Sequence, residues 1–509
     1  MPDPVPLDGR SLTLEEFVAV ARRGVPVVLA PEAVVRVRAS REAVDRAVAA
    51  GRPVYGVTTG FGALSAVTIP REKVRELQVS LVRSHASGTG PALAEDVVRG
   101  LMLLRVNSLA RGLSGVRPEL LEQLVAFLNR HLVPWIPEQG SVGASGDLAP
   151  LAHLALALTG EGAFRTPTNP EPLPAAAVLA RERLRPVDLA AKEGVALLNG
   201  TALMASYLAL GVVDARELLG AATVAAAMSV DALLGSPASF DDRLGEARNA
   251  PDERAVAAAL RSLLEGSELA VARTDWVGQD PYTLRCLPQV LGAARTAVEL
   301  AASVVGRELN AVTDNPLVLG PEEFVSGGNF HGQTLAFALD ALALGVQYVA
   351  GFSERRTARL VHPGLNRGLP AFLAPEPGVT SGFMVPQYVA AALVNENASL
   401  VHPASATSLP TSADQEDYVS MGAWAGAKLG RVLENARNVV AIEWIVAGSA
   451  LEHRRPKVGG RGTVAALRAL RTRSPPFEAD RSLAEEIHRV AEAIGRGELT
   501  REVRASVSF

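Results

Sequence analysis

The chain has 509 residues, 48% hydrophobic but only 5% aromatic, so alanine, leucine and valine must fill a large core. Its formal net charge of −4 gives no reason to expect nucleic acid or an anionic membrane as a partner. Cys286 is the single cysteine, which excludes an intramolecular disulfide and predicts a reducing, cytoplasmic setting.

The first part of the chain alternates helical patterns with breaks. Residues 12–50 show short helical stretches interrupted at Gly24 and Pro31. Residues 55–62 read Y-G-V-T-T-G-F-G, which is too rich in glycine and threonine for a helix and predicts a loop. A proline-rich stretch, 166–174, predicts an exposed connection. Helical periodicity is also found at 72–83, 96–110 and 118–132.

The pattern changes near residue 203. Beyond it, long stretches rich in alanine, leucine and valine predict the core helices of a bundle, at 206–234, 284–311, 332–360 and 417–450. We therefore expect two domains, an N-terminal domain at 1–202 and a helical-bundle domain with C-terminal helices at 203–509. The uninterrupted apolar stretches, such as 218–230, are shorter than a membrane span, so no membrane is expected.

The most informative stretch is 140–154, G-S-V-G-A-S-G-D-L-A-P-L-A-H-L. Its glycines and the small Ala144-Ser145-Gly146 tripeptide allow the backbone to fold sharply enough for one peptide unit to touch another. Asp147 is placed to cap a helix that runs from 148 to 158, with Pro150 in its first turn. A bare A-S-G would be an ordinary turn, and the spelling G-A-S-G-D does not fit the nucleophile elbow G-x-S-x-G.

In this context the tripeptide resembles that of the histidine and aromatic amino-acid ammonia-lyases. In that family the glycine nitrogen attacks the alanine carbonyl, two waters leave, and an electrophilic 4-methylidene-imidazol-5-one (MIO) ring results. The resemblance implies that Ala144 supplies the carbonyl carbon, Ser145 the methylene and Gly146 the nitrogen. It also implies a mainly α, fumarase/aspartase-like fold, with the MIO loop in the N-terminal domain, and a homotetramer that shares active sites between subunits.

Further motifs extend the resemblance over essentially the whole chain, in the family's order. They lie in Y-G-V-T-T-G-F-G, Ser84-His85-Ala86, L-L-N-G-T, the block 279–286, Asn329-Phe330-His331 and Gln415-Glu416-Asp417. The implied catalytic residues, besides the tripeptide, are Tyr55 and Tyr282. The implied substrate-binding residues are His85, Asn199, Gln279, Arg285, Phe330 and Glu416.

The chemistry explains these residue types. The β-hydrogen of an amino acid is not acidic, so losing ammonia requires both a strong electrophile and a well-placed base. Tyr55 would remove that proton, although a free phenol has a pKa near about 10 and must be shifted down to act near neutrality. Arg285 would hold the substrate carboxylate with a bidentate fork that lysine cannot reproduce. The plainer alternatives are aromatic packing for Tyr55 and Tyr282 and a structural ion pair for Arg285.

The identity of the substrate rests on two residues. Family members acting on histidine tend to carry His at the His85 position and Glu at the Glu416 position, and an imidazole can hydrogen-bond both. A phenyl ring would leave the carboxylate facing an apolar edge. We therefore expect L-histidine to be converted to urocanate and ammonia, as in histidine catabolism.

Several alternatives stay open. Tyrosine-selective relatives also use His at the His85 position, phenylalanine is disfavoured, and an aminomutase or a non-enzymatic scaffold with a relic loop is not excluded. His85 could be a helix-end histidine satisfied by backbone, and Glu416 a solvated loop acid. Tyr418 stands where histidine lyases often carry His, Thr407 where Asp is common and Gly278 where Val is frequent. These departures put the shape and charge of the ring pocket in doubt.

No other cofactor is indicated. The eight histidines include no H-E-x-x-H pair, and one cysteine cannot build a thiolate cluster. No phosphate loop or dinucleotide fingerprint occurs either. We expect no metal and no nucleotide, and we interpret His153 as a core or supporting residue of the helix that follows the MIO loop.

Overall fold

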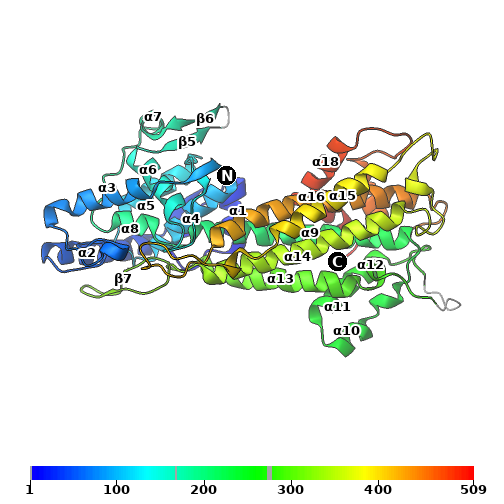
Figure 1. The fold of residues 1–509 in the computed structure, drawn as a ribbon, viewed down its shortest axis with the longest axis horizontal. Coiled ribbons are helices and arrows are strands. Elements are labelled where there is room, and N and C mark those ends of the chain that lie inside the picture. Colours follow the sequence, from blue (N-terminus) through cyan, green and yellow to red (C-terminus); the bar gives the residue numbers. More distant parts are fainter. Residues whose placement is uncertain (1–2, 167–168, 272–277) are drawn as a thin grey trace. The chain divides into compact units, whose positions relative to one another are not determined.

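The computed structural model describes residues 3–166, 169–271 and 278–509. Within them the chain is mainly helical, with α-helices α1 to α19 and four two-stranded sheets (Figure 1). The expectation of a mainly α fold is confirmed. The chain divides into two compact units, one made of 1–210, 302–340 and 403–427, the other of 211–301, 341–402 and 428–509.

The first unit contains most of the short elements. Its strands are β1 (Val5–Leu7), β2 (Val27–Leu29), β3 (Thr89–Ala92), β4 (Pro137–Gln139), β5 (Ala163–Thr166), β6 (Asn169–Pro174), β7 (Leu317–Val318) and β8 (Phe324–Val325). Strands β1 and β2 pair in parallel, and the other pairs are antiparallel. Its helices are α1 (Leu14–Arg23), α2 (Pro31–Ala49), α3 (Val74–His85), α4 (Glu95–Ala110), α5 (Pro118–Asn129), α6 (Leu148–Thr159), α7 (Ala175–Arg181) and α8 (Glu193–Leu198).

The second unit is built from helices. Those that lie wholly within it are α10 (Asp242–Arg248), α11 (Pro251–Leu263), α12 (Tyr282–Arg285), α15 (Met384–Leu400), α17 (Arg461–Arg471), α18 (Ala484–Gly495) and α19 (Glu498–Arg504). Four long helices have residues in both units: α9 (Ala202–Ala232), α13 (Leu287–Glu308), α14 (Gln333–Val361) and α16 (Gly422–Glu452). The chain thus returns to the first unit at 302 and again at 403. The two domains predicted from the sequence, 1–202 and 203–509, have a single boundary instead.

Helix α4 lies at the centre of the first unit. Every residue from Val97 to Ala110 is buried, including the two arginines Arg99 and Arg105. Helices α1, α2 and α5 pack against it, and α3, α6 and α8 pack against one another. Burying a single leucine is worth about 1.5–3 kcal/mol, so this helix contributes strongly to the stability of the unit.

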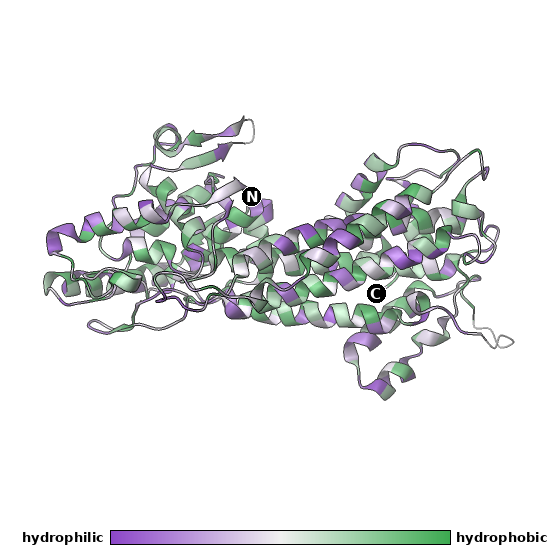
Figure 2. Cartoon of the chain, in the orientation of Figure 1, coloured by the Kyte–Doolittle hydropathy of each residue, from purple (hydrophilic) through white to green (hydrophobic). Residues whose placement is uncertain are grey.

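Two of the largest buried polar side chains of the second unit have well-placed partners. The Trp444 indole N–H donates to the Ala221 carbonyl at 2.9 Å. The Arg356 guanidinium forms a bidentate pair with Glu443 at 2.6 and 2.7 Å, and both side chains are fully buried. Figure 2 shows hydrophobic residues along much of the long helices. Among the described residues, one helix, α14, is long and apolar enough by length and composition to cross a membrane, and 61% of that window is buried within the fold.

The elements agree with most of the predicted ones, with one clear difference. The stretch 166–174 was predicted as an exposed connection, but β5 and β6 pair there as an antiparallel hairpin, with residues 167–168 outside the described ranges. The prediction was wrong because prolines are tolerated in short edge strands, where they need not donate to a ladder. Helix α15 was not predicted at all.

Candidate active site

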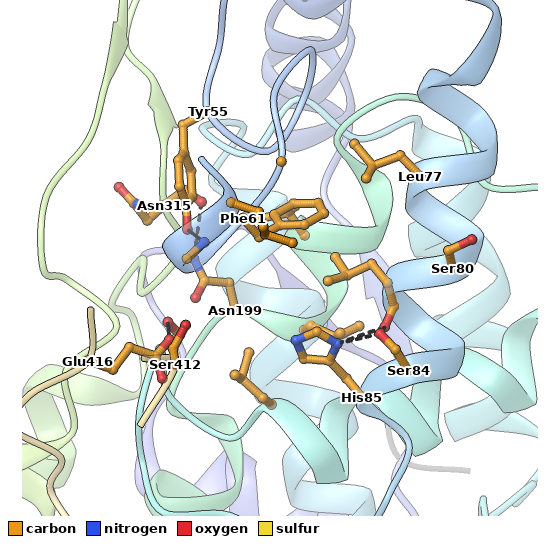
Figure 3. A pocket seen from close by; sticks show the side chains of 18 of the residues that line it. Tyr55, Phe61, Leu77, Ser80, Ser84, His85, Asn199, Asn315, Ser412 and Glu416 are labelled. Carbon is orange, nitrogen blue, oxygen red and sulfur yellow. Dashed lines mark hydrogen bonds between the residues drawn. The ribbon is translucent and has the colours of Figure 1, made fainter. Parts of the chain in front are cut away.

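A cavity of ≈ 630 Å³ lies within the first unit (Figure 3). It is formed by the loop around Tyr55, helix α3, the loop before α6, the end of α8, and segments near 315, 330 and 412–416. Its polar and aromatic lining residues are Tyr55, Phe61, Ser80, Ser84, His85, Ser145, Asn199, Asn315, Phe330, Ser412 and Glu416. Six of the residues proposed from the sequence therefore share one cavity: Tyr55, His85, Ser145, Asn199, Phe330 and Glu416.

The Ala144-Ser145-Gly146 tripeptide forms a sharp backbone turn at this cavity. Ser145 has φ +50° and Gly146 φ +82°, and the left-handed region is strained for a serine. A Cβ on Gly146 would lie 2.0 Å from the Gly200 carbonyl oxygen, so only glycine fits. The Gly200 N–H donates to the Ser145 carbonyl at 3.2 Å. The residues present thus fit an MIO ring, whose closure requires a tight turn and an unshielded glycine nitrogen.

Asp147 has a different role from the one predicted. It precedes α6, but its side chain makes no capping bond to that helix. Its carboxylate instead accepts the N–H groups of Leu203 at 2.9 Å and Met204 at 3.1 Å, so it caps the start of α9. The prediction was wrong because the Asp147 N–H bonds the Gly200 carbonyl, which brings the carboxylate next to the first turn of α9. Complete burial raises the pKa of Asp147 to about 7.

Tyr55 lies in the predicted loop and is partly buried. Its hydroxyl oxygen accepts the Gly62 N–H at 3.1 Å, and its ring meets the Phe61 ring edge-on at 6.4 Å. The Gln78 side chain of α3 donates to the Gly56 carbonyl and so ties the loop to that helix. The phenol is therefore held at the cavity by contacts from its own loop.

His85 is the last residue of α3, and its ring lines the cavity. Its Nδ1 lies 2.9 Å from the Leu81 carbonyl, which can only accept, so this bond places the ring proton on Nδ1. The neutral ring then offers the Nε2 lone pair, and in Figure 3 the second nitrogen is on the side toward Glu416 and Asn199. Burial lowers the pKa of His85, while the Leu81 bond and the Glu416 charge oppose that shift. His85 is thus bonded to backbone and available to a ligand at the same time.

Glu416 lies on the opposite side of the cavity in Figure 3. Its Oε2 accepts the Thr411 hydroxyl at 2.9 Å, and its Oε1 accepts the Ser145 hydroxyl at 3.2 Å. Backbone bonds between Thr411 and Glu416 close the loop that carries it. Glu416 is therefore an ordered acid that contacts the tripeptide, rather than a freely solvated one.

Asn199 is buried at the end of α8, and its amide donates to the Asn315 carbonyl at 3.0 Å. Asn315 also lines the cavity but was not singled out from the sequence, and neither were Phe61 and Ser412. The D-N-P spelling at 314–316, just after a helix, is the one local signal that could have drawn attention to Asn315.

The remaining predicted residues lie in the second unit. Tyr282 and Arg285 are on the short helix α12, with the Arg285 guanidinium 4.8 Å from the Tyr282 ring centre. The Tyr282 side chain is 66% exposed, and Gln279 is exposed just before the helix. In the ranges that the structure describes, no group of three or more His, Cys, Asp or Glu residues is arranged to hold a metal.

Comparison with known proteins places this geometry in context. The family model described as aromatic amino acid lyase matches residues 12–472. A histidine ammonia-lyase from Symbiobacterium thermophilum is 51% identical, over 98% of each chain. Among solved structures, a tyrosine aminomutase from Streptomyces globisporus superposes with TM-score 0.95 at 37% identity, over 100% of this chain and 99% of that one. Histidine ammonia-lyase from Trypanosoma cruzi superposes with TM-score 0.91 at 39% identity, over 99% and 96%.

Proposed function

The chain belongs to the aromatic amino acid lyase family, and on that premise we propose that it eliminates ammonia from L-histidine to give trans-urocanate. The observation that carries the choice of histidine is the pair of acceptors in the cavity, His85 Nε2 and the Glu416 carboxylate. A histidine side chain in its imidazolium form has two N–H donors, one for each acceptor. A phenol has one donor and a phenyl ring has none.

Formation of the MIO ring would prepare the site for the imidazole ring of the substrate. The Ser145 hydroxyl that now donates to Glu416 Oε1 leaves as water when the MIO ring forms from Ala144, Ser145 and Gly146. Glu416 would then have a free acceptor for the substrate. The MIO ring supplies an electrophile that makes the amino group a good leaving group.

The chain's own residues supply the rest of the reaction. Tyr55, held at the cavity by Gly62, would take the β-proton, and the electron pair left behind forms the C=C bond as the C–N bond breaks. Asn199 and Phe330 line the cavity and would orient the substrate.

We also propose that the site is completed by neighbouring copies in an intracellular homotetramer. Gln279 and Tyr282 are exposed, and Arg285 lies half-buried beside Tyr282, where it would bind the substrate carboxylate of another subunit's site. Large apolar side chains that are about half exposed on the long helices would bury themselves in such an assembly, namely Phe337, Tyr348, Val385, Tyr388 and Trp424.

The decisive test offers purified protein L-histidine, L-tyrosine and L-phenylalanine separately and follows the ultraviolet absorbance of each unsaturated acid. We expect urocanate from histidine and much slower reaction with the other two. Coumarate or cinnamate as the main product would overturn the substrate and keep the reaction class. Intact mass, measured on the same sample, shows whether the chain has lost two waters.

An aminomutase is the second candidate, because a tyrosine aminomutase superposes on this chain so closely. Such an enzyme returns the ammonia to the β-carbon. Chromatography of the same reactions would then detect a β-amino acid, which the lyase does not release.

A further inference from the structure

Two arginines of helix α4 are buried to the same extent but bonded very differently. Arg99 is 2% exposed, and its three guanidinium nitrogens donate to the backbone carbonyls of Val20 and Leu128 at 2.9–3.2 Å. Arg105 is 1% exposed, and only its Nη1 has a partner; its Nε and Nη2 have none among the described residues. An unmet buried donor costs about 1–3 kcal/mol, so folding alone would favour an apolar side chain at position 105.

The single bond of Arg105 leads to the active site. Its Nη1 donates to the Asn199 carbonyl at 2.7 Å. A Cβ on the next residue, Gly200, would lie 2.4 Å from the same nitrogen, so the guanidinium lies beside Gly200 where a side chain would otherwise be. Together with the φ of +149° and the Thr313 hydroxyl, the guanidinium leaves room only for glycine at position 200.

Gly200 in turn determines the position of the tripeptide. Its N–H donates to the Ser145 carbonyl at 3.2 Å, and its carbonyl accepts the Asp147 N–H at 2.7 Å. These two bonds bracket Gly146, the residue whose nitrogen must reach the Ala144 carbonyl carbon. A shift of the 199–200 backbone would therefore move the atoms that form the ring.

A buried ion pair lies close enough to the guanidinium to interact with it electrostatically. Lys192 Nζ bonds Asp314 Oδ2 at 2.7 Å, and both side chains are fully buried. Burial lowers the pKa of Arg105 and of Lys192, and the Asp314 charge opposes both shifts. Asp314 is thus the counter-charge for two cations, and it precedes Asn315, whose carbonyl holds the Asn199 amide.

We propose that Arg105 is a positioning residue for the maturation of the tripeptide: through Asn199 and Gly200 it holds Ser145, Gly146 and Asp147 in the geometry required for ring closure. In that closure the Gly146 nitrogen bonds the Ala144 carbonyl carbon. The Ala144 oxygen leaves as water with the amide hydrogens of Ser145 and Gly146. The Ser145 hydroxyl leaves as water with the Ser145 α-hydrogen. This inference rests on the proposed function, because it assumes that the ring forms.

The experiment compares Arg105→Lys and Arg105→Met with Arg99→Lys, a control on the same helix with the same burial. Each full-length protein is purified, checked by circular dichroism and thermal melting, and weighed by intact mass spectrometry. The mature form is the one that is lighter by two waters. At equal folded fraction, we expect its share to be at least about tenfold smaller in both Arg105 variants than in Arg99→Lys. Asp314→Asn, which keeps an acceptor for Lys192, should mature partially and so remains informative if the Arg105 variants fail to fold.

The readouts separate the two proposals. If the wild-type chain itself has not lost two waters, the proposed function fails and this inference with it. If the wild type matures and the folded Arg105 and Asp314 variants mature as fully as Arg99→Lys, only the inference fails. If all variants, including Arg99→Lys, lose the mature form in proportion to their loss of melting temperature, Arg105 is merely structural and the inference is wrong.

Discussion

The cavity has two sides that are built in different ways. Its floor, which we define as the lining residues Ser145 and Asn199 with Gly146, Asp147 and Gly200 next to them, is held by backbone bonds and by buried charges behind them. Its rim, defined as Tyr55, His85 and Glu416, presents partly buried side chains on a loop, a helix end and a second loop. At the floor a methyl group added to Gly146 would strike a carbonyl, whereas the rim meets the cavity through side chains.

This difference suggests which side of the cavity determines the reaction and which determines substrate selectivity. The reaction depends on the floor, where only particular backbone conformations fit, so changes there should remove activity altogether. At the rim, Tyr55 is the proposed base, so a change there should also inactivate the enzyme, whereas changes at His85 and Glu416 should alter substrate selectivity. The experiments below test this separation.

The largest expected effect is that of Ser145→Ala. Without the hydroxyl no methylene can form, so the electrophile is lost and turnover should fall by about 10³-fold or more. The variant should keep its full sequence mass and the wild-type melting temperature, because Ser145 has one side-chain bond, to Glu416. Histidine turnover within tenfold of wild type would show that the tripeptide is not the electrophile.

His85→Phe tests the rim. The change removes the Nε2 acceptor and adds an apolar face, so kcat/KM for histidine should fall by roughly 10²-fold or more while that for phenylalanine rises. Arg83→Gln is the matched control, since Arg83 lies one half-turn earlier on α3 and pairs with Glu161 at the surface. Steady-state kinetics with both substrates should show no change in selectivity for the control. Equal losses for both substrates in His85→Phe would instead indicate damage to the floor.

Glu416→Gln should have a smaller effect of the same kind. Glutamine keeps the shape but removes the charge that would pair with an imidazolium, at a cost of about 1.5–3 kcal/mol, or about 10–150-fold in kcat/KM for histidine. Tyrosine, which offers one donor, should be affected much less. If the two substrates lose kcat/KM equally, Glu416 does not recognise the ring. Intact mass on the same variant shows whether losing the Ser145–Glu416 bond has changed maturation.

The sequence predicted the features of the floor and the rim that depend on short, contiguous stretches of residues. The tripeptide and the loop around Tyr55 are short strings with glycines at the turns, and the long helices show a clear hydrophobic period. The rim residues could be predicted as site residues because each belongs to a short motif that resembles one of the family. The prediction missed what depends on distant pairing: Asp147 caps α9 rather than α6 because of its bond to Gly200, and Asn315 reaches the cavity from more than a hundred residues away.

The ion pairs behind the floor could not have been predicted for the same reason. Arg105, Lys192 and Asp314 each look like an ordinary charged residue in an amphipathic or loop segment. Their burial follows from the packing of α4 and α8 with the 313–315 segment, and no local pattern shows it. Helix α15 was missed because its apolar residues lack a clear face, several of them being exposed.

The smallest expected effect concerns His153, which joins the two sides of the cavity. Its Nε2 accepts the Gly88 N–H at 3.1 Å, so it ties the segment after His85 to α6, the helix after the floor. Burial lowers the pKa of His153, so the neutral form is favoured in the folded state. The stability it contributes is fully present above the unfolded pKa of about 6.5 and is lost as pH falls from there toward the folded pKa. Because the ring is only partly buried, we expect a loss of about 1–2 °C in melting temperature between pH 7 and 5.

His153→Gln can keep an acceptor for Gly88 without titrating, so its melting temperature should fall less over this range. If wild type and His153→Gln fall equally, this contact does not set the acid sensitivity of the fold, and His85, the partly buried histidine that lines the cavity, becomes the group to test.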